Sequence, residues 1–168
     1  MADGYLETLL RYLAIDLGDR RTGFAVGDDV TGLVQPAGAT ETPIEHAGGM
    51  SLEREIERAI EEYLNRGDEL VFGLPINMDG SEGVRAKRVR AMADRVASRT
   101  GRRVHFQDER LTTADADWQM ARTGMTHGQK KTRRDAIAAA TILRDFLTAL
   151  HNPAEPFSDD DEGDTNDD

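Results

Sequence analysis

The sequence predicts an α/β protein built on a mixed, five-stranded sheet flanked by helices. Three short apolar runs joined by turns open the chain, which predicts an antiparallel meander. Further apolar runs then alternate with helical patterns, which is typical of parallel strands joined by crossover helices. A length of 168 residues fits one domain that buries its own core.

The three leading strands are expected at residues 13–17, 24–26 and about 33–40. The first is a compact apolar run, and residues 18–23 form the turn into the second. Pro36 lies in the third strand, and because proline cannot donate to a ladder we expect that strand at an edge or an irregular position.

A helix and a buried strand are expected next. Apolar residues recur at three- and four-residue spacing over residues 51–65, which predicts an amphipathic helix, and Gly67 is its expected C-cap. Residues 69–74 form the second strongly apolar run, which Pro75 ends. This run predicts the fourth strand.

The second half of the chain predicts three helices around one more strand. A helix is expected from Ser81, with an inner stripe of valines and methionine, followed by a strand at residues 104–106. Residues 112–115 have the pattern of a capping box, which predicts a helix to about residue 121. The last helix is expected from about residue 133 to 150.

Composition excludes several classes of protein. The chain has no cysteine, which excludes a disulfide framework, cysteine-type zinc sites and thiol catalysis. No apolar run approaches the ~20 residues that a membrane span needs, and the N-terminus lacks the features of a signal peptide. We therefore expect a cytoplasmic protein with no membrane association.

The formal charge of −11 is unevenly distributed. Residues 85–134 hold 14 of the 21 Lys and Arg residues against five acids, whereas the segments on either side are strongly acidic. Such an asymmetry is typical of nucleic-acid contact or of charged tails. The total charge therefore does not exclude a polyanionic partner.

The chain ends in an acidic tail. Residues 158–168 contain seven acids, no base and no apolar residue, so they cannot bury enough surface to offset the entropy of ordering. We expect an N-terminal extension at residues 1–10, a folded domain at residues 11–151 and a disordered acidic tail at residues 152–168.

Asp16 is an acid inside an apolar strand. A lone ionised carboxylate buried in a strand costs several kcal/mol unless it is paired or bound to a metal. One interpretation makes Asp16 a metal ligand, and the other makes it a strand-end cap of the turn at Gly18.

Asp108 and Glu109 follow the strand at residues 104–106, where the carboxyl end of a strand commonly faces a ligand. The alternative is a solvated loop in which Glu109 pairs with Arg110. The sequence leaves open which of the two acids would serve as a ligand.

Asp135 leads the face of the last helix that is expected to pack on the sheet. Behind Thr132, it could also complete a capping box and complement the helix dipole. Together, acids from the first strand, from a strand end and from the last helix suit Mg²⁺ or Mn²⁺, which take oxygen ligands and stabilise both oxygens in phosphodiester cleavage.

Basic residues predict where a nucleic-acid backbone would bind. Lys130, Lys131, Arg133 and Arg134 put four bases into five residues, which repel one another unless an anion lies nearby. Arg110 is a further candidate for phosphate contact. The arginines between residues 85 and 99 are interpreted as a solvated helix face.

Four segments resemble the YqgF-type family, also called the RuvX family, of pre-16S rRNA nucleases and Holliday junction resolvase-like proteins. They are AIDLG with RTGFAV (14–26), GLPINMDGSEG (73–83), DERLTT (108–113) and Asp135 with its following alanines. The resemblance spans about residues 12–150 in order. Asp19-Arg20 stands where the family commonly has a small or Thr-Lys pair, and the acidic tail lies outside the family core.

The resemblance implies a ribonuclease H-like fold and a metal-dependent nuclease, a hydrolase acting on ester bonds, that processes the 5′ end of precursor 16S rRNA during ribosome biogenesis. It implies that Asp16, Glu109 and Asp135 are catalytic and hold Mg²⁺ or Mn²⁺. Two alternatives stay open, a Holliday junction-resolving DNA endonuclease and a non-catalytic nucleic-acid-binding module. A monomer and a homodimer are both compatible with the sequence.

Overall fold

A mixed sheet of five strands, in the spatial order β3-β2-β1-β4-β5, forms the centre of the molecule. The computed structural model describes residues 9–111 and 126–153. The strands are β1 (Arg11–Leu17), β2 (Thr22–Asp28), β3 (Val34–Thr40), β4 (Glu69–Leu74) and β5 (Val104–Asp108). The first three pair antiparallel, and β4 pairs parallel with both β1 and β5. The predicted meander with parallel crossovers is confirmed, with Pro36 on an edge strand.

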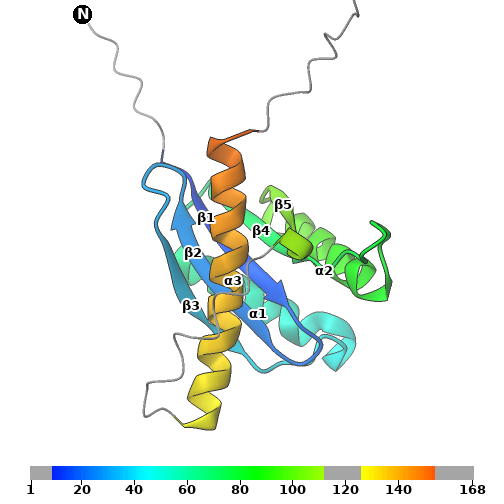
Figure 1. The fold of residues 1–168 in the computed structure, drawn as a ribbon. Helices are drawn as coiled ribbons and strands as arrows, with labels where there is room; N and C mark the ends of the chain where they lie inside the picture. Colours follow the sequence, from blue (N-terminus) through cyan, green and yellow to red (C-terminus); the bar gives the residue numbers. More distant parts are fainter. Residues whose placement is uncertain (1–8, 112–125, 154–168) are drawn as a thin grey trace, which may run out of the picture.

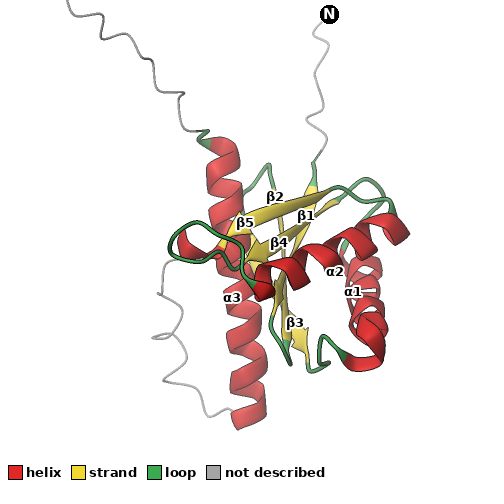
Figure 2. Cartoon of the chain, turned by 90° about the vertical axis from the view of Figure 1, so that its right-hand side faces the viewer, coloured by secondary structure: helices red, strands yellow, loops and turns green. Residues whose placement is uncertain are grey.

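Helices cover both faces of the sheet. They are α1 (Met50–Tyr63), α2 (Val84–Thr100), α3 (His127–His151) and the short 3-10 helices η1 (His46–Gly49) and η2 (Glu109–Leu111). The long α3 crosses one face, and α1 and α2 lie against the other (Figures 1 and 2). None of the helices within residues 9–111 and 126–153 is long and apolar enough to cross a membrane.

The two faces bury different side chains. On β1, Leu13 and Ile15 belong to a core of large residues shared with α1 and α2, whereas Tyr12 and Ala14 belong to the core under α3. Successive side chains of a strand alternate between faces, so Asp16 points toward α3. The fold thus directs the one acid of β1 to the face that α3 covers.

The N-terminus of α3 differs from the expected one. The helix begins at His127 rather than near residue 133, because Thr126 and Gln129 form a reciprocal capping box. The Gln129 N–H donates to the Thr126 side chain, and the Thr126 N–H donates to the Gln129 side chain. The predicted cap formed by Thr132 and Asp135 is wrong, because both residues lie inside the helix.

Two other boundaries shift for local reasons. α1 ends at Tyr63 because Leu64 is extended and buried, so Gly67 is not its C-cap. α2 begins at Val84 rather than Ser81, since the Ser81 N–H and hydroxyl both donate to the Asp79 carboxylate in the preceding loop. The helix expected at residues 112–121 and most of the acidic tail lie outside the described residues.

Candidate active site

Asp16 is half-buried on β1, opposite Gly23 of β2. The turn after β1 is closed by the Gly18 N–H, which donates to the Arg21 carbonyl at 2.9 Å. The turn is therefore closed by a backbone hydrogen bond and not by the side chain of Asp16. The carboxyl group of Asp16 forms a hydrogen bond with Glu109 instead.

Glu109 is the residue of the Asp108–Glu109 pair that reaches Asp16. It opens η2 directly after β5, and its carboxyl group meets that of Asp16. Asp108 is paired with Arg110, whose Nη2 lies 2.7 Å from Oδ2, and this interaction lowers the pKa of Asp108. Arg110 thus pairs with the other acid of the two.

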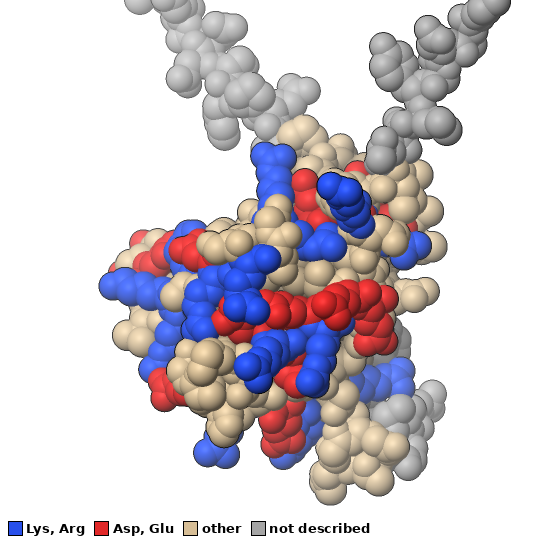
Figure 3. Space-filling model, turned by 180° about the vertical axis from the view of Figure 1, so that it is seen from behind, with Lys and Arg blue, Asp and Glu red and all other residues tan. Residues whose placement is uncertain are grey.

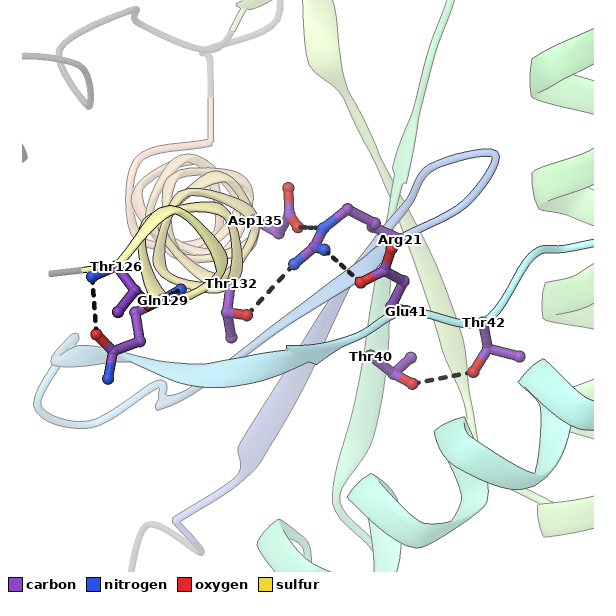
Figure 4. Close-up of polar contacts among 8 residues, drawn as sticks. All are labelled: Arg21, Thr40, Glu41, Thr42, Thr126, Gln129, Thr132 and Asp135. Atoms are coloured by element: carbon purple, nitrogen blue, oxygen red, sulfur yellow. Dashed lines mark hydrogen bonds and ion pairs between the residues drawn. The ribbon is translucent and has the colours of Figure 1, made fainter.

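Asp135 approaches the same face from α3. Its Oδ2 accepts a hydrogen bond from Arg21 Nε at 2.5 Å, and Arg21 also bonds Glu41 and Thr132 (Figure 4). Arg21 therefore ties the turn after β1 to the end of β3 and to α3. This contact fixes where the Asp135 carboxylate lies.

The three acids interact electrostatically. Burial raises the pKa of Asp16, and the negative charge of Asp135 raises it further. Burial, and then the charge of Asp16, raise the pKa of Glu109 to about 7. Arg85 lowers the pKa of both groups, but burial and the neighbouring acids outweigh it.

The carboxylate oxygens of the three acids are suitable ligands for a divalent metal ion, but the three groups do not converge on one point in this structure. Within residues 9–111 and 126–153, no three His, Cys, Asp or Glu side chains converge tightly enough to hold one. Two of the predicted ligands meet each other, and the third is turned toward Arg21. The donor set is nevertheless all oxygen, partly buried and mutually repelling, which is the environment that a hard divalent cation relieves.

The predicted phosphate-binding residues occupy two places. Lys130, Lys131, Arg133 and Arg134 lie on the first two turns of α3, ahead of Asp135, and all but Lys130 are exposed. Arg110 lies beside the acids, where its Nη1 also donates to the Asn77 carbonyl at 3.3 Å.

Most arginines of α2 form ion pairs with glutamates, as expected for a solvated helix face. Four of the five form ion pairs, with Glu45, Glu82, Glu53 and Glu57 as partners. The view from behind shows these positive and negative side chains interleaved (Figure 3). Among the described contacts, Arg85 forms no ion pair and instead acts on the pKa values of Asp16 and Glu109.

Four residues close to the three acids were not among the predicted site residues: Arg21, Arg85, Gly23 and Gly73. Arg85 was interpreted as part of a solvated helix face, and Arg21 stands in a segment that carries the family resemblance but was assigned no role. The glycines did give a signal, since a glycine inside a strand often marks a close approach of another group. Both stand within apolar strands.

The chain is similar to known proteins over most of its length. The family model described as "RuvX: Holliday junction resolvase" matches residues 10–149. A curated protein of Anaeromyxobacter sp. (strain Fw109-5), named "Putative pre-16S rRNA nuclease", is 37% identical over 142 residues, which cover 84% of this chain and 99% of the relative. A protein of the same name from Agathobacter rectalis is 36% identical over 143 residues, or 85% and 98% of the two chains.

A solved structure of T. thermophilus RuvC in complex with a Holliday junction substrate is similar to the fold. Its TM-score is 0.53, with 11% identity, over 85% of this chain and 96% of that one. At this identity the likeness concerns the fold alone, and it confirms the expected ribonuclease H-like architecture.

Proposed function

The chain belongs to the RuvX family, and from this premise we propose that it is a nuclease that processes the 5′ end of precursor 16S rRNA. The relatives' names and the match over most of the chain support this proposal. Its reaction class is the hydrolysis of phosphodiester bonds, and its place of action is the cytoplasm, as part of ribosome biogenesis.

One observation carries the proposal, namely the acidic cluster on the α3 face of the sheet. Asp16 and Glu109 meet on that face, and the charge of Asp135 acts on Asp16. A structural role does not explain this arrangement, because like charges brought together in a partly buried place oppose folding. Active sites are where such a cost is commonly retained.

Each acid has a role in this proposal. Asp16, Glu109 and Asp135 hold Mg²⁺ or Mn²⁺ through their carboxylate oxygens. The ion, when bound, supplies an activated water and neutralises charge on the phosphate. Before an ion binds, Arg21 holds the Asp135 carboxylate in place.

The basic residues bind and orient the substrate backbone. Lys130, Lys131, Arg133 and Arg134 present positive charge on the first turns of α3, on the helix that carries Asp135. Arg85 acts on the pKa values of Asp16 and Glu109. Arg110 follows Glu109 in η2, so both arginines add positive charge close to the acids. Phosphate contacts of this kind fix the register of a nucleic acid without reading its sequence.

The experiment is to incubate the purified full-length protein with precursor 16S rRNA and to map the 5′ ends. Cleavage is expected with Mg²⁺ or Mn²⁺ and not with a chelator. Asp16→Asn should remove cleavage while RNA binding persists, whereas Asp94→Asn, on the exposed side of α2, should cleave like the wild type. Full cleavage by Asp16→Asn would contradict the mechanism, and binding without any cleavage would favour a non-catalytic module.

A second candidate function is resolution of four-way DNA junctions. The description of the matching family model favours it. The same acids would serve, so the discriminating measurement is the cleavage of a four-way DNA junction against that of a pre-rRNA 5′ leader by one preparation. A homodimer in solution would favour the junction, because a two-fold substrate suits a two-fold protein.

A further inference from the structure

Two glycines flank Asp16 in one row across the sheet. Gly23 of β2 is its antiparallel partner. On the other side β4 runs parallel to β1, with Ile15 opposite Phe72, so Gly73 is the residue next to Asp16. Neither glycine has a positive φ, so backbone conformation does not require glycine at either position.

Gly23 lets α3 touch the sheet at Asp135. A Cβ at Gly23 would lie 2.0 Å from the Asp135 carbonyl oxygen and 2.4 Å from its carbonyl carbon. These are backbone atoms of a helix, so any side chain at this position would push α3 away from β2. The closeness of Asp135 to Asp16 therefore depends on the missing side chain.

Gly73 makes the corresponding space for Glu109. A Cβ at this position would lie 2.6 Å from Glu109 Oε1 and 2.5 Å from Ile142 Cδ1. The Glu109 carboxylate thus lies against the backbone of β4. A methyl group there would occupy the place from which Glu109 reaches Asp16.

We propose that Gly23 and Gly73 are positioning residues of the active site, which set the places of Asp135 and Glu109 relative to Asp16. This inference rests on the proposed nuclease function. The two glycines act through the acids, and each controls a different one.

The test uses Gly73→Ala in the full-length protein, because its methyl group meets only the ends of two side chains and the fold can adjust. We expect unchanged RNA binding and a cleavage rate about 100-fold lower, the cost of a misplacement of about 1 Å. A crystal structure of the variant without metal should show the Glu109 carboxylate displaced from Asp16. A carboxylate that stays in place would overturn the inference.

A second substitution separates positioning from packing. Ile142→Val removes the Cδ1 atom that the methyl group introduced by Gly73→Ala would meet, but it leaves the clash with Glu109. The variant carrying both Gly73→Ala and Ile142→Val should regain thermal stability and stay deficient in cleavage. Recovery of wild-type cleavage by this double variant would show that packing alone was at fault.

Gly23→Ala and Gly128→Ala complete the set. Gly23→Ala should lower both the unfolding temperature and cleavage, because it displaces helix backbone. Gly128→Ala is the matched control on α3, since a Cβ there meets nothing within 4 Å, and it should cleave like the wild type. If the wild type itself cleaves no substrate, the proposed function fails, while the position of Glu109 in Gly73→Ala still decides the positioning role.

Discussion

The two faces of the sheet treat charge in opposite ways. On the side covered by α1 and α2, Glu53 of α1 is 5% exposed, and Arg95 and Arg99 of α2 both reach its carboxylate, at 2.5 and 3.1 Å. Under α3, Asp135 pairs with Arg21, but Asp16 and Glu109 meet each other, and the pKa values of both rise. The first arrangement stabilises the fold, whereas the second opposes it.

Packing follows the same division. The core under α1 and α2 is built from large residues such as Leu52, Ile56 and Phe72. The core under α3 is rich in alanine, and glycines let the helix and an acid touch the strands. One face holds most of the buried apolar residues, and on the other face glycines leave room for the backbone of Asp135 and the carboxylate of Glu109 to lie against the strands.

The largest expected effect distinguishes two neighbouring acids. Glu109→Gln should lower cleavage about 1,000-fold or more, a loss of ~4 kcal/mol of transition-state stabilisation. Asp108→Asn, which loses only its pairing with Arg110, should keep most of the activity. Single-turnover cleavage of the same RNA measures both. Equal losses in the two variants would remove the distinction that the structure makes between them.

Neutralising one acid on each face should change stability in opposite directions. Glu53→Gln should lower the free energy of unfolding by about 1–2 kcal/mol, because its two arginines are partly exposed and screened. Asp16→Asn should raise it in the absence of metal by up to about 1 kcal/mol, since a repelled carboxylate is removed. Urea denaturation in a chelator checks both signs, and destabilisation by Asp16→Asn would contradict the comparison.

Two arginines of α2 should differ in what their substitution changes: cleavage for one and stability for the other. Arg85→Ala is expected to lower cleavage about fivefold, or ~1 kcal/mol, with little change in the unfolding temperature. Arg99→Ala, which loses Glu53 and Glu57, should lower the unfolding temperature and leave cleavage unchanged. Steady-state kinetics and thermal denaturation of the two variants test this division, which fails if both variants behave alike.

The smallest effect concerns pH. Both ring nitrogens of His151 face backbone carbonyls, of Leu147 at 2.7 Å and of Asp29 at 2.6 Å, and these contacts raise its pKa above 6.5. Protonated His151 therefore stabilises the folded state. This stabilisation is complete below about pH 6.5 and is lost as the pH rises through the pKa that His151 has in the folded protein. The unfolding temperature of wild type should exceed that of His151→Gln at pH 5.5, and the gap should shrink at pH 8.5. A constant gap would show that the proton plays no part.

Local patterns predicted the sheet well. The alternation of apolar runs with turns gave its mixed topology, and Asp16 stood out because a carboxylate is costly in an apolar strand. The choice between Asp108 and Glu109 was beyond the sequence, since it depends on how η2 turns after β5. The pairing of Arg95 with Glu53 could not be predicted from the sequence either, because the two partners come from different helices.

The start of α3 shows why boundaries were harder. The sequence pattern placed the cap at Thr132 and Asp135. The capping box formed by Thr126 and Gln129 instead starts the helix about two turns earlier, and the helix packs along β2 and β3. The position of Asp135 within the helix, and its contact with Arg21, follow from this earlier start. Arg21 is distant in sequence from Asp135, so no local pattern reveals the pair.

Calorimetric titration of Mn²⁺ into wild type, Asp16→Asn and Glu53→Gln tests the contrast between the two faces most directly. Wild type and Glu53→Gln should bind Mn²⁺ with similar affinity, and Asp16→Asn should show no binding. Binding by Asp16→Asn with the affinity of the wild type would contradict the assignment of the α3 face as the metal-dependent centre of a nuclease.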